Sequence, residues 1–215
     1  IDMSSSMLAK DLKPNRIEAL KRVAAQFIQQ RASDRIGIVV YSGESYTKVP
    51  ATTDKSIVLQ ALKEIRQGEI EDGTAIGMGL GTAINRLKDS KTKSKVIILM
   101  TDGVNNTGVI DPLSAAELAK EYGIRVYTIG IGTNGKALSP VAYNPDGSWQ
   151  YGMVPVEIDE KLLTQIAQTT GGHYFRATDN RKLVQIYTEI DKLEKSKIEE
   201  LKYYQYQEKF RLWAF

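Results

Sequence analysis

Three short, almost purely apolar runs constrain the fold of this chain most strongly. They occupy residues 35–41, 95–101 and 125–131, and they are rich in Ile and Val between segments with turn residues. Continuous apolar runs of this length are typical of strands that are covered on both faces, as in a parallel sheet. Residues 173–176 form a shorter fourth candidate. Residues 46–49 form a candidate edge strand that ends before Pro50.

Amphipathic segments alternate with these runs. We expect helices where apolar residues recur with helical spacing, over residues 16–30, 55–65, 75–87, 113–122, 159–169 and 179–195. Alternation of strands and helices predicts an α/β fold, with a doubly wound, mostly parallel Rossmann-like sheet, helices on both faces and an antiparallel edge strand. The expected domain covers residues 1–195, and residues 196–215 are expected to form a connector.

Residues 133–155 interrupt the alternation. They are rich in Gly, Pro, Asn and aromatic residues, and residues 144–147 read Asn-Pro-Asp-Gly, a strong turn signal. Residues 141–143 and 149–153 could be the two arms of a hairpin. Because long irregular segments are often functional, we treat this one as a candidate binding element.

Composition limits the chemistry that the chain can perform. The 29 basic and 26 acidic residues leave a net charge of +3 without a basic cluster, which argues against a nucleic-acid partner. The chain has no cysteine and one histidine, His173, so thiolate sites and multi-histidine zinc sites are excluded. A metal ion would have to be held by oxygen, which favours Mg²⁺ or Mn²⁺, with Ca²⁺ less favoured.

Three polar clusters are expected at the carboxyl ends of strands, where ligands gather in open α/β sheets. They are Asp-Met-Ser-Ser-Ser at residues 2–6, Asp-Gly-Thr at residues 72–74 and Thr-Asp-Gly at residues 101–103. In extended backbone, alternate residues project in the same direction. The candidate metal ligands are therefore Asp2, Ser4, Ser6, Thr74 and Asp102. Five oxygen ligands leave one position open on an ion such as Mg²⁺, which takes six.

This set of residues resembles the metal-ion-dependent adhesion site of von Willebrand factor A domains and integrin inserted domains. All five positions are matched, in sequence order. The resemblance implies that the serines and the threonine contact the ion, that the aspartates act directly or through water, and that a partner's Asp or Glu fills the open position. It also implies that most of the first strand lies before residue 1.

Across nearly the whole chain, the sequence resembles the BatA group of aerotolerance-operon proteins. The segments that carry this resemblance are residues 11–16, 71–79, 110–112 and 156–160. The resemblance implies an A domain anchored in the bacterial inner membrane, and we expect it to face the periplasm. It also implies other Bat-type proteins and a MoxR-type AAA+ ATPase as partners.

Two other functions fit parts of the pattern. A strand-terminal Asp2 with Mg²⁺ ligands could serve a phosphoryl-transfer enzyme, although Ser4 stands where such an enzyme needs a second acid. A metal-free scaffold for complex assembly is the other alternative. We favour a non-enzymatic, cation-dependent protein-binding module. We interpret Asp72 as a turn residue, Asn105 and Asn106 as solvated loop residues, and the glycines at 77, 79 and 81 as helix-packing positions rather than a nucleotide loop.

Overall fold

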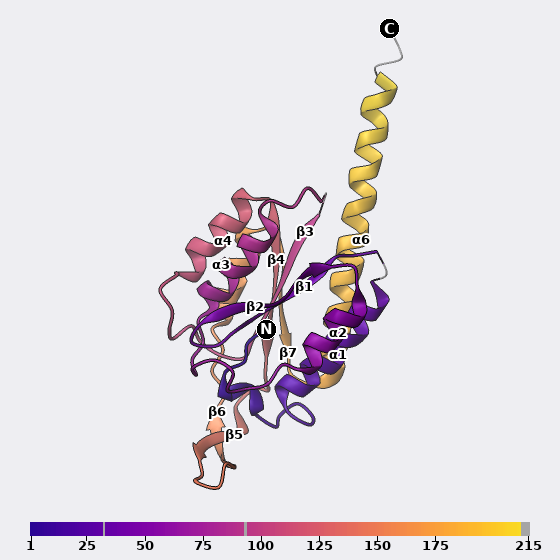
Figure 1. The fold of residues 1–215 in the computed structure, drawn as a ribbon. Helices are drawn as coiled ribbons and strands as arrows, with labels where there is room; N and C mark the ends of the chain where they lie inside the picture. Colours follow the sequence, from indigo (N-terminus) through magenta and orange to yellow (C-terminus); the bar gives the residue numbers. More distant parts are fainter. Residues whose placement is uncertain (32, 93, 212–215) are drawn as a thin grey trace.

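A parallel sheet of three strands forms the centre of the fold (Figure 1). β3 (Lys95–Thr101), β4 (Ile124–Ile131) and β7 (Tyr174–Ala177) lie in the order β3-β4-β7. The structure is a computed structural model that describes residues 1–31, 33–92 and 94–211, with side chains up to residue 195. Two of the apolar runs predicted as covered strands, residues 95–101 and 125–131, form β3 and β4, and most residues of β4 are buried. The third, residues 35–41, lies outside this sheet and pairs antiparallel with another strand.

An antiparallel pair lies beside this sheet. β1 (Ile36–Tyr41) pairs with β2 (Ser45–Thr52). The prediction that the edge strand ends before Pro50 was wrong, because β2 continues through Pro50 to Thr52. Pro50 is tolerated because the β1–β2 register is irregular there, between the pairs Ile38–Val49 and Ile36–Thr52.

A cavity of about 840 Å³ extends between β1 and β3, lined by residues 36–39 and 95–100 together with residues of α1 and α6. The chain enters between the two strands only at their carboxyl ends. There Asp2 forms a parallel bridge with Tyr41, and its backbone N–H donates to the carbonyl of Met100 at 3.1 Å. We call this space the interstrand cavity.

Helices cover both faces of the sheet, as predicted (Figure 1). One face carries α1 (Arg16–Gln30), α2 (Lys55–Lys63) and α6 (Asn180–Arg211), and the other carries α3 (Ile76–Leu87), α4 (Pro112–Glu121) and α5 (Glu160–Thr169). α6 extends beyond the predicted end of its helix at residue 195. Within the described helices, none combines the length and apolar content needed to cross a membrane.

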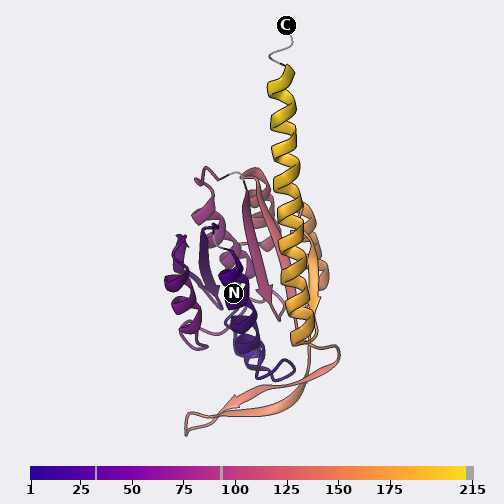
Figure 2. The same cartoon turned by 90° about the vertical axis from the view of Figure 1, so that its right-hand side faces the viewer.

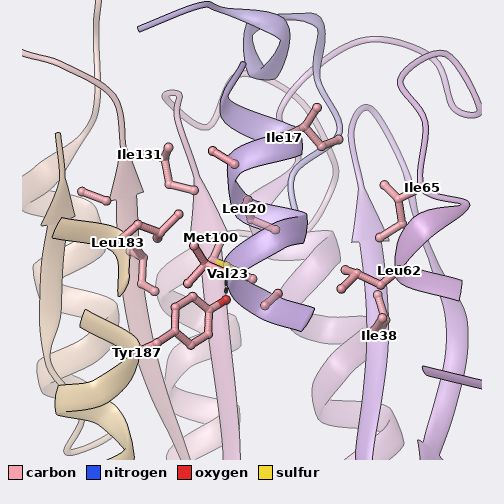
Figure 3. Close-up of a cluster of buried hydrophobic side chains, with 14 of the residues drawn as sticks. Ile17, Leu20, Val23, Ile38, Leu62, Ile65, Met100, Ile131, Leu183 and Tyr187 are labelled. Carbon is pink, nitrogen blue, oxygen red and sulfur yellow. Dashed lines mark hydrogen bonds between the residues drawn. The ribbon is translucent and has the colours of Figure 1, made fainter. Parts of the chain in front are cut away.

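Each helical face encloses its own apolar core. Figure 3 shows the core under α1, α2 and α6, where the Tyr187 hydroxyl donates to the Met100 sulfur at 2.9 Å. The glycines of α3 allow close packing on the opposite face. A Cβ at position 77 would overlap the Ile110 carbonyl, and one at position 79 would stand 2.6 Å from the Tyr41 ring. These contacts agree with a packing role for both glycines.

The segment that interrupts the alternation forms a hairpin. β5 (Lys136–Tyr143) pairs antiparallel with β6 (Trp149–Pro155), so both arms are longer than predicted. The hairpin projects beyond the end of the sheet opposite to the direction in which α6 extends (Figure 2). Its root, residues 132–135, joins the end of β4 to the start of β5. The hairpin therefore lies at the carboxyl end of the parallel strands.

Candidate metal centre

The predicted ligands gather at the carboxyl end of β3. The loop at residues 2–6, which leads into the short 3-10 helix η1 (Ser5–Leu8), meets the turn before α3 and the loop after β3. Asp2, Ser4, Thr74 and Asp102 are all less than 5% exposed, and Ser6 is partly exposed. Buried polar side chains must be satisfied by partners, and the partners here are largely one another.

Two of the hydroxyls form a chain that ends on a carboxylate. The Ser6 hydroxyl donates to Asp102 Oδ1 at 2.7 Å and lies 2.9 Å from the Ser4 hydroxyl. Because the Ser6 proton is used on Asp102, Ser4 is the donor to Ser6. Three of the five predicted ligands, Ser4, Ser6 and Asp102, therefore form one hydrogen-bonded chain. The contact between the two serines agrees with the prediction that alternate residues project in the same direction.

Asp2 lies beneath this chain and is completely buried. Its Oδ1 accepts the backbone N–H of Ser4 at 2.9 Å, and its Oδ2 accepts the Thr101 hydroxyl at 2.6 Å. Burial, together with the charge of Asp102, raises the pKa of Asp2 to about 7. The sequence analysis missed the role of Thr101, whose position directly before Asp102 was the available signal.

Thr74 is held in the turn before α3 by the loop that follows β3. Its N–H donates to Asn106 Oδ1 at 2.9 Å, and its carbonyl accepts the N–H of Asn106 at 3.1 Å. Asn105 accepts the N–H of Ile76 at 2.8 Å. Both side chains therefore brace this turn, a role that our interpretation as solvated loop residues did not include, although Asn106 is exposed.

Asp72 organises the first loop. It accepts the N–H of Ser5 at 2.8 Å and the hydroxyl of Ser5 at 2.6 Å. This contact leaves the Ser5 side chain directed away from the Ser4–Ser6 chain. The role expected of Asp72, shaping a turn rather than binding an ion, fits this geometry.

The sequence analysis also missed Arg16, the first residue of α1. Arg16 is 2% exposed, and its Nη1 donates to Asp102 Oδ2 at 2.6 Å. Its Nε and Nη2 donate to the two oxygens of Asp11, at 2.8 and 2.7 Å. Burial raises the pKa of Asp102, although Arg16 and Ser6 act in the opposite direction. A buried arginine 86 positions from its partner leaves no periodic signal in a sequence.

The donor set suits a hard divalent cation. Among the described side chains, no group of three or more His, Cys, Asp or Glu residues could hold a metal ion, so a cation at this site would depend on hydroxyls as well as carboxylates. Two buried carboxylates that resist joint ionisation, beside neutral hydroxyls, favour the approach of a cation. Asp2, Ser4, Ser6, Thr74 and Asp102 are therefore the residues that could hold it.

The comparison with known families agrees with the fold. The chain belongs to the von Willebrand factor type A domain family, whose family model matches residues 1–189. Among solved structures, the conserved hypothetical protein BatB from Bacteroides thetaiotaomicron is 30% identical, with a TM-score of 0.76 over 90% of this chain and 96% of that one.

Other relatives are similar to most of this chain. An aerotolerance-related membrane protein from Bacteroides fragilis is 26% identical, with a TM-score of 0.75 over 89% of this chain and 94% of that one. A UPF0353 protein of Mycolicibacterium paratuberculosis is 31% identical over 204 residues, covering 89% of this chain and 58% of that protein. An uncharacterized protein of Borreliella burgdorferi is also 31% identical, over 84% of this chain and 53% of its own length. The chain thus spans little more than half the length of these two relatives.

A more distant neighbour shares the fold. The proximal thread matrix protein 1 of the mussel byssus, described with a zinc-occupied MIDAS motif, is 22% identical with a TM-score of 0.68, over 90% of this chain and 43% of that one. The resemblance to A domains and to the aerotolerance group is confirmed.

Proposed function

We propose that this domain is a divalent-cation-dependent protein-binding module. Its ligands are Asp2, Ser4, Ser6, Thr74 and Asp102, and its ion is Mg²⁺ or Mn²⁺. The observation that carries the proposal is the chain of Ser4, Ser6 and Asp102, which lies beside the buried carboxylate of Asp2. Ca²⁺ is less favoured, because it usually takes six to eight oxygen ligands, whereas this site offers few carboxylates.

The partner contributes an Asp or Glu to the ion. Mg²⁺ takes six ligands, so five protein groups, some acting through water, leave a position for another oxygen. Hydroxyl ligands are neutral and reduce the charge of the ion less than carboxylates would. The ion therefore keeps its attraction for an acidic side chain on another protein.

The proposal assigns no catalytic step to the site. A phosphoryl-transfer enzyme would need Asp2 as an accessible nucleophile. Asp2 is completely buried, and both of its oxygens accept hydrogen bonds, from Ser4 and Thr101. These contacts favour a binding role over the enzymatic alternative.

At the level of the whole protein, we propose a membrane-anchored, Bat-like protein. The support is the similarity to BatB and to an aerotolerance-related membrane protein. The proposed location is the periplasmic face of a bacterial inner membrane. Other Bat-type proteins and a MoxR-type AAA+ ATPase are the proposed partners.

Calorimetric titration with Mg²⁺ and with Mn²⁺ tests the cation site. We expect binding by the wild type and its loss in Asp2→Ala and Asp102→Ala. Asp111→Ala is the matched control, because Asp111 caps α4 through Ser114 and lies outside the site. If the wild type binds neither ion, or if Asp102→Ala binds equally well, the metal-free scaffold is the better description.

A pull-down from membranes tests the partner. We expect the wild type, and not Asp102→Ala, to retain a protein that a chelator releases. A partner retained equally by both proteins and in the presence of chelator would contradict cation-dependent binding.

A further inference from the structure

Arg16 is the first residue of α1, but its side chain is buried, unlike that of a charged residue at a solvent-exposed helix end. Its side chain is 3% exposed, and all of its described hydrogen bonds go to the carboxylates of Asp102 and Asp11. Burying a guanidinium is costly unless it is fully paired. The site therefore contains a permanent positive charge, the guanidinium of Arg16, which belongs to the protein itself.

We propose that Arg16 is a positioning residue, which orients Asp102 for the metal ion and links the ion site through Asp11 to the root of the β5–β6 hairpin. This inference rests on the proposed cation site. It adds a residue to the site and gives the site a means of communicating with a projecting element.

The orientation of Asp102 follows from how its oxygens are divided. Arg16 binds Oδ2 at 2.6 Å, and Ser6 binds Oδ1 at 2.7 Å. With Oδ2 fixed, Oδ1 is the oxygen that faces the Ser4–Ser6 chain. The planar fork of arginine holds Asp102 and Asp11 at the same time, which a lysine ammonium cannot do with the same geometry.

The link to the hairpin runs through Asp11. Asp11 Oδ2 accepts the Arg16 Nη2 donor and also the backbone N–H of Thr133 at 2.8 Å. Thr133 precedes β5 by three residues. A second contact adjoins it, because the N–H of Lys10 donates to the Leu138 carbonyl of β5 at 2.9 Å.

Two sites joined by one buried network affect each other reciprocally. An ion that fixes Asp102 also fixes Arg16 and Asp11, and so protects the Thr133 amide. The hairpin exposes Val141, Tyr143 and Met153 at 49%, 64% and 61%. Ion binding would thus steady an element that projects from the same end of the molecule as the site.

Two substitutions separate positioning from simple charge compensation. If Arg16 positions Asp102, Arg16→Lys keeps the charge but weakens Mg²⁺ binding by about 10–100-fold, the usual effect of losing a group that orients a metal ligand. If Arg16 only offsets negative charge, Arg16→Lys binds like the wild type and Arg16→Met binds more tightly. Calorimetry with Mg²⁺ distinguishes these outcomes. Wild-type affinity in Arg16→Lys, or tighter binding in Arg16→Met, would overturn the inference.

Hydrogen exchange tests the link to the hairpin, first in the wild type and then in a variant. We expect Mg²⁺ to slow exchange of the Thr133 amide in the wild type and to have no such effect in Arg16→Lys. A cooperative unfolding transition, measured in the presence of chelator, establishes that each variant is folded without the ion. Unchanged Thr133 exchange in wild type that binds Mg²⁺ would overturn the link.

Arg176→Met is the matched control. Arg176 of β7 donates to the carbonyls of Gly132 and Thr133, at 3.1 and 3.0 Å, but makes no hydrogen bond to Asp102 among the described contacts. Arg176→Met should loosen the hairpin root and, because the coupling is reciprocal, weaken Mg²⁺ binding, but by less than Arg16→Lys does, since the Arg16–Asp102 contact is kept. Failure of the wild type to bind Mg²⁺ would instead reject the proposed function, together with this inference.

Discussion

Gly132 shows how closely the hairpin root is fitted to Arg16. Its φ of +147° lies in a region that favours glycine, and a Cβ there would stand 2.8 Å from Arg16 Nη2. A side chain at this position would therefore press on the guanidinium that holds Asp102. At Gly132, both the positive φ and the nearby Arg16 guanidinium therefore disfavour any side chain.

Gly132→Ala should destabilise the protein more than Gly135→Ala does. Gly135 also has a positive φ, +92°, but a Cβ there meets no atom within 4 Å. The backbone penalty is about 1–3 kcal/mol at each position, and crowding adds about 1–3 kcal/mol at Gly132 alone. Urea unfolding of both variants measures the difference in the free energy of unfolding. Equal losses of stability would show that the Arg16 side chain can move aside without an energetic penalty.

The packing of α6 against β4 depends on a buried acid. Glu194 Oε1 accepts Arg125 Nη1 at 2.5 Å and the Tyr127 hydroxyl at 2.6 Å, and its side chain is 6% exposed. Burial by itself would raise the pKa of Glu194. The hydrogen bonds from Tyr127 and Arg125 outweigh burial, so its pKa lies below the ordinary value.

We therefore expect Glu194→Gln to lose stability in a pH-dependent manner. A depressed pKa contributes stability above the unfolded value, about 4.3, and that contribution disappears as pH falls through the folded pKa. The deficit of Glu194→Gln should be constant above about pH 5.5 and shrink in more acidic solution. Denaturant unfolding across this range checks it, and a deficit independent of pH would contradict the assignment.

The elements differ in how far the sequence could predict them. Periodicity located α1 and β3 with the bounds that the structure has, because burial of an apolar face decides both. It stopped β2 too early, since Pro50 is accommodated by a register irregularity that no local pattern reveals. At the candidate site, the spacing of Ser4 and Ser6 predicted that their side chains lie together, and their hydroxyls are 2.9 Å apart. Arg16 and Asn106 were missed because their partners lie far away in the sequence.

The interstrand cavity separates β1 from β3, and the first two residues of the chain lie at one end of it. Ile1 donates its amino group to the Val39 carbonyl at 2.9 Å, and Asp2 donates to Met100 on the other side. Burial lowers the pKa of the Ile1 ammonium to about 5. A segment joined before Ile1 would continue between β1 and β3.

Extending the chain by an apolar, β-branched segment before Ile1 should therefore stabilise the domain. The added strand would fill the cavity and pair with both neighbouring strands. Hydrogen exchange would show new protection for amides of β1 and β3 that face the cavity, and the melting temperature would rise. An extension of equal length made of Gly and Ser is the control, and equal stability of the two proteins would contradict this role for the cavity.

At the scale of the whole molecule, the site and the far end of α6 lie at opposite ends. The hairpin projects from the carboxyl end of the parallel strands, and α6, with 32 residues and a length of about 48 Å, extends the other way (Figures 1 and 2). A strand in the interstrand cavity would also enter from the end toward which α6 extends. The proposed membrane anchor, if attached beyond α6, would thus hold the ion site away from the bilayer.

Single labels can test this orientation in a membrane-anchored form of the protein. The chain has no cysteine, so Lys91→Cys, in the loop before β3, and Asp146→Cys, at the tip of the hairpin, each give one reactive thiol. Both positions are exposed. A lipid-attached quencher in reconstituted vesicles should quench a fluorophore at position 91 more strongly than one at position 146, because an anchor beyond α6 would place the amino end of β3 nearer the bilayer. The reverse order would mean that the site faces the membrane, and a partner carboxylate would then have to come from a protein within or against the bilayer.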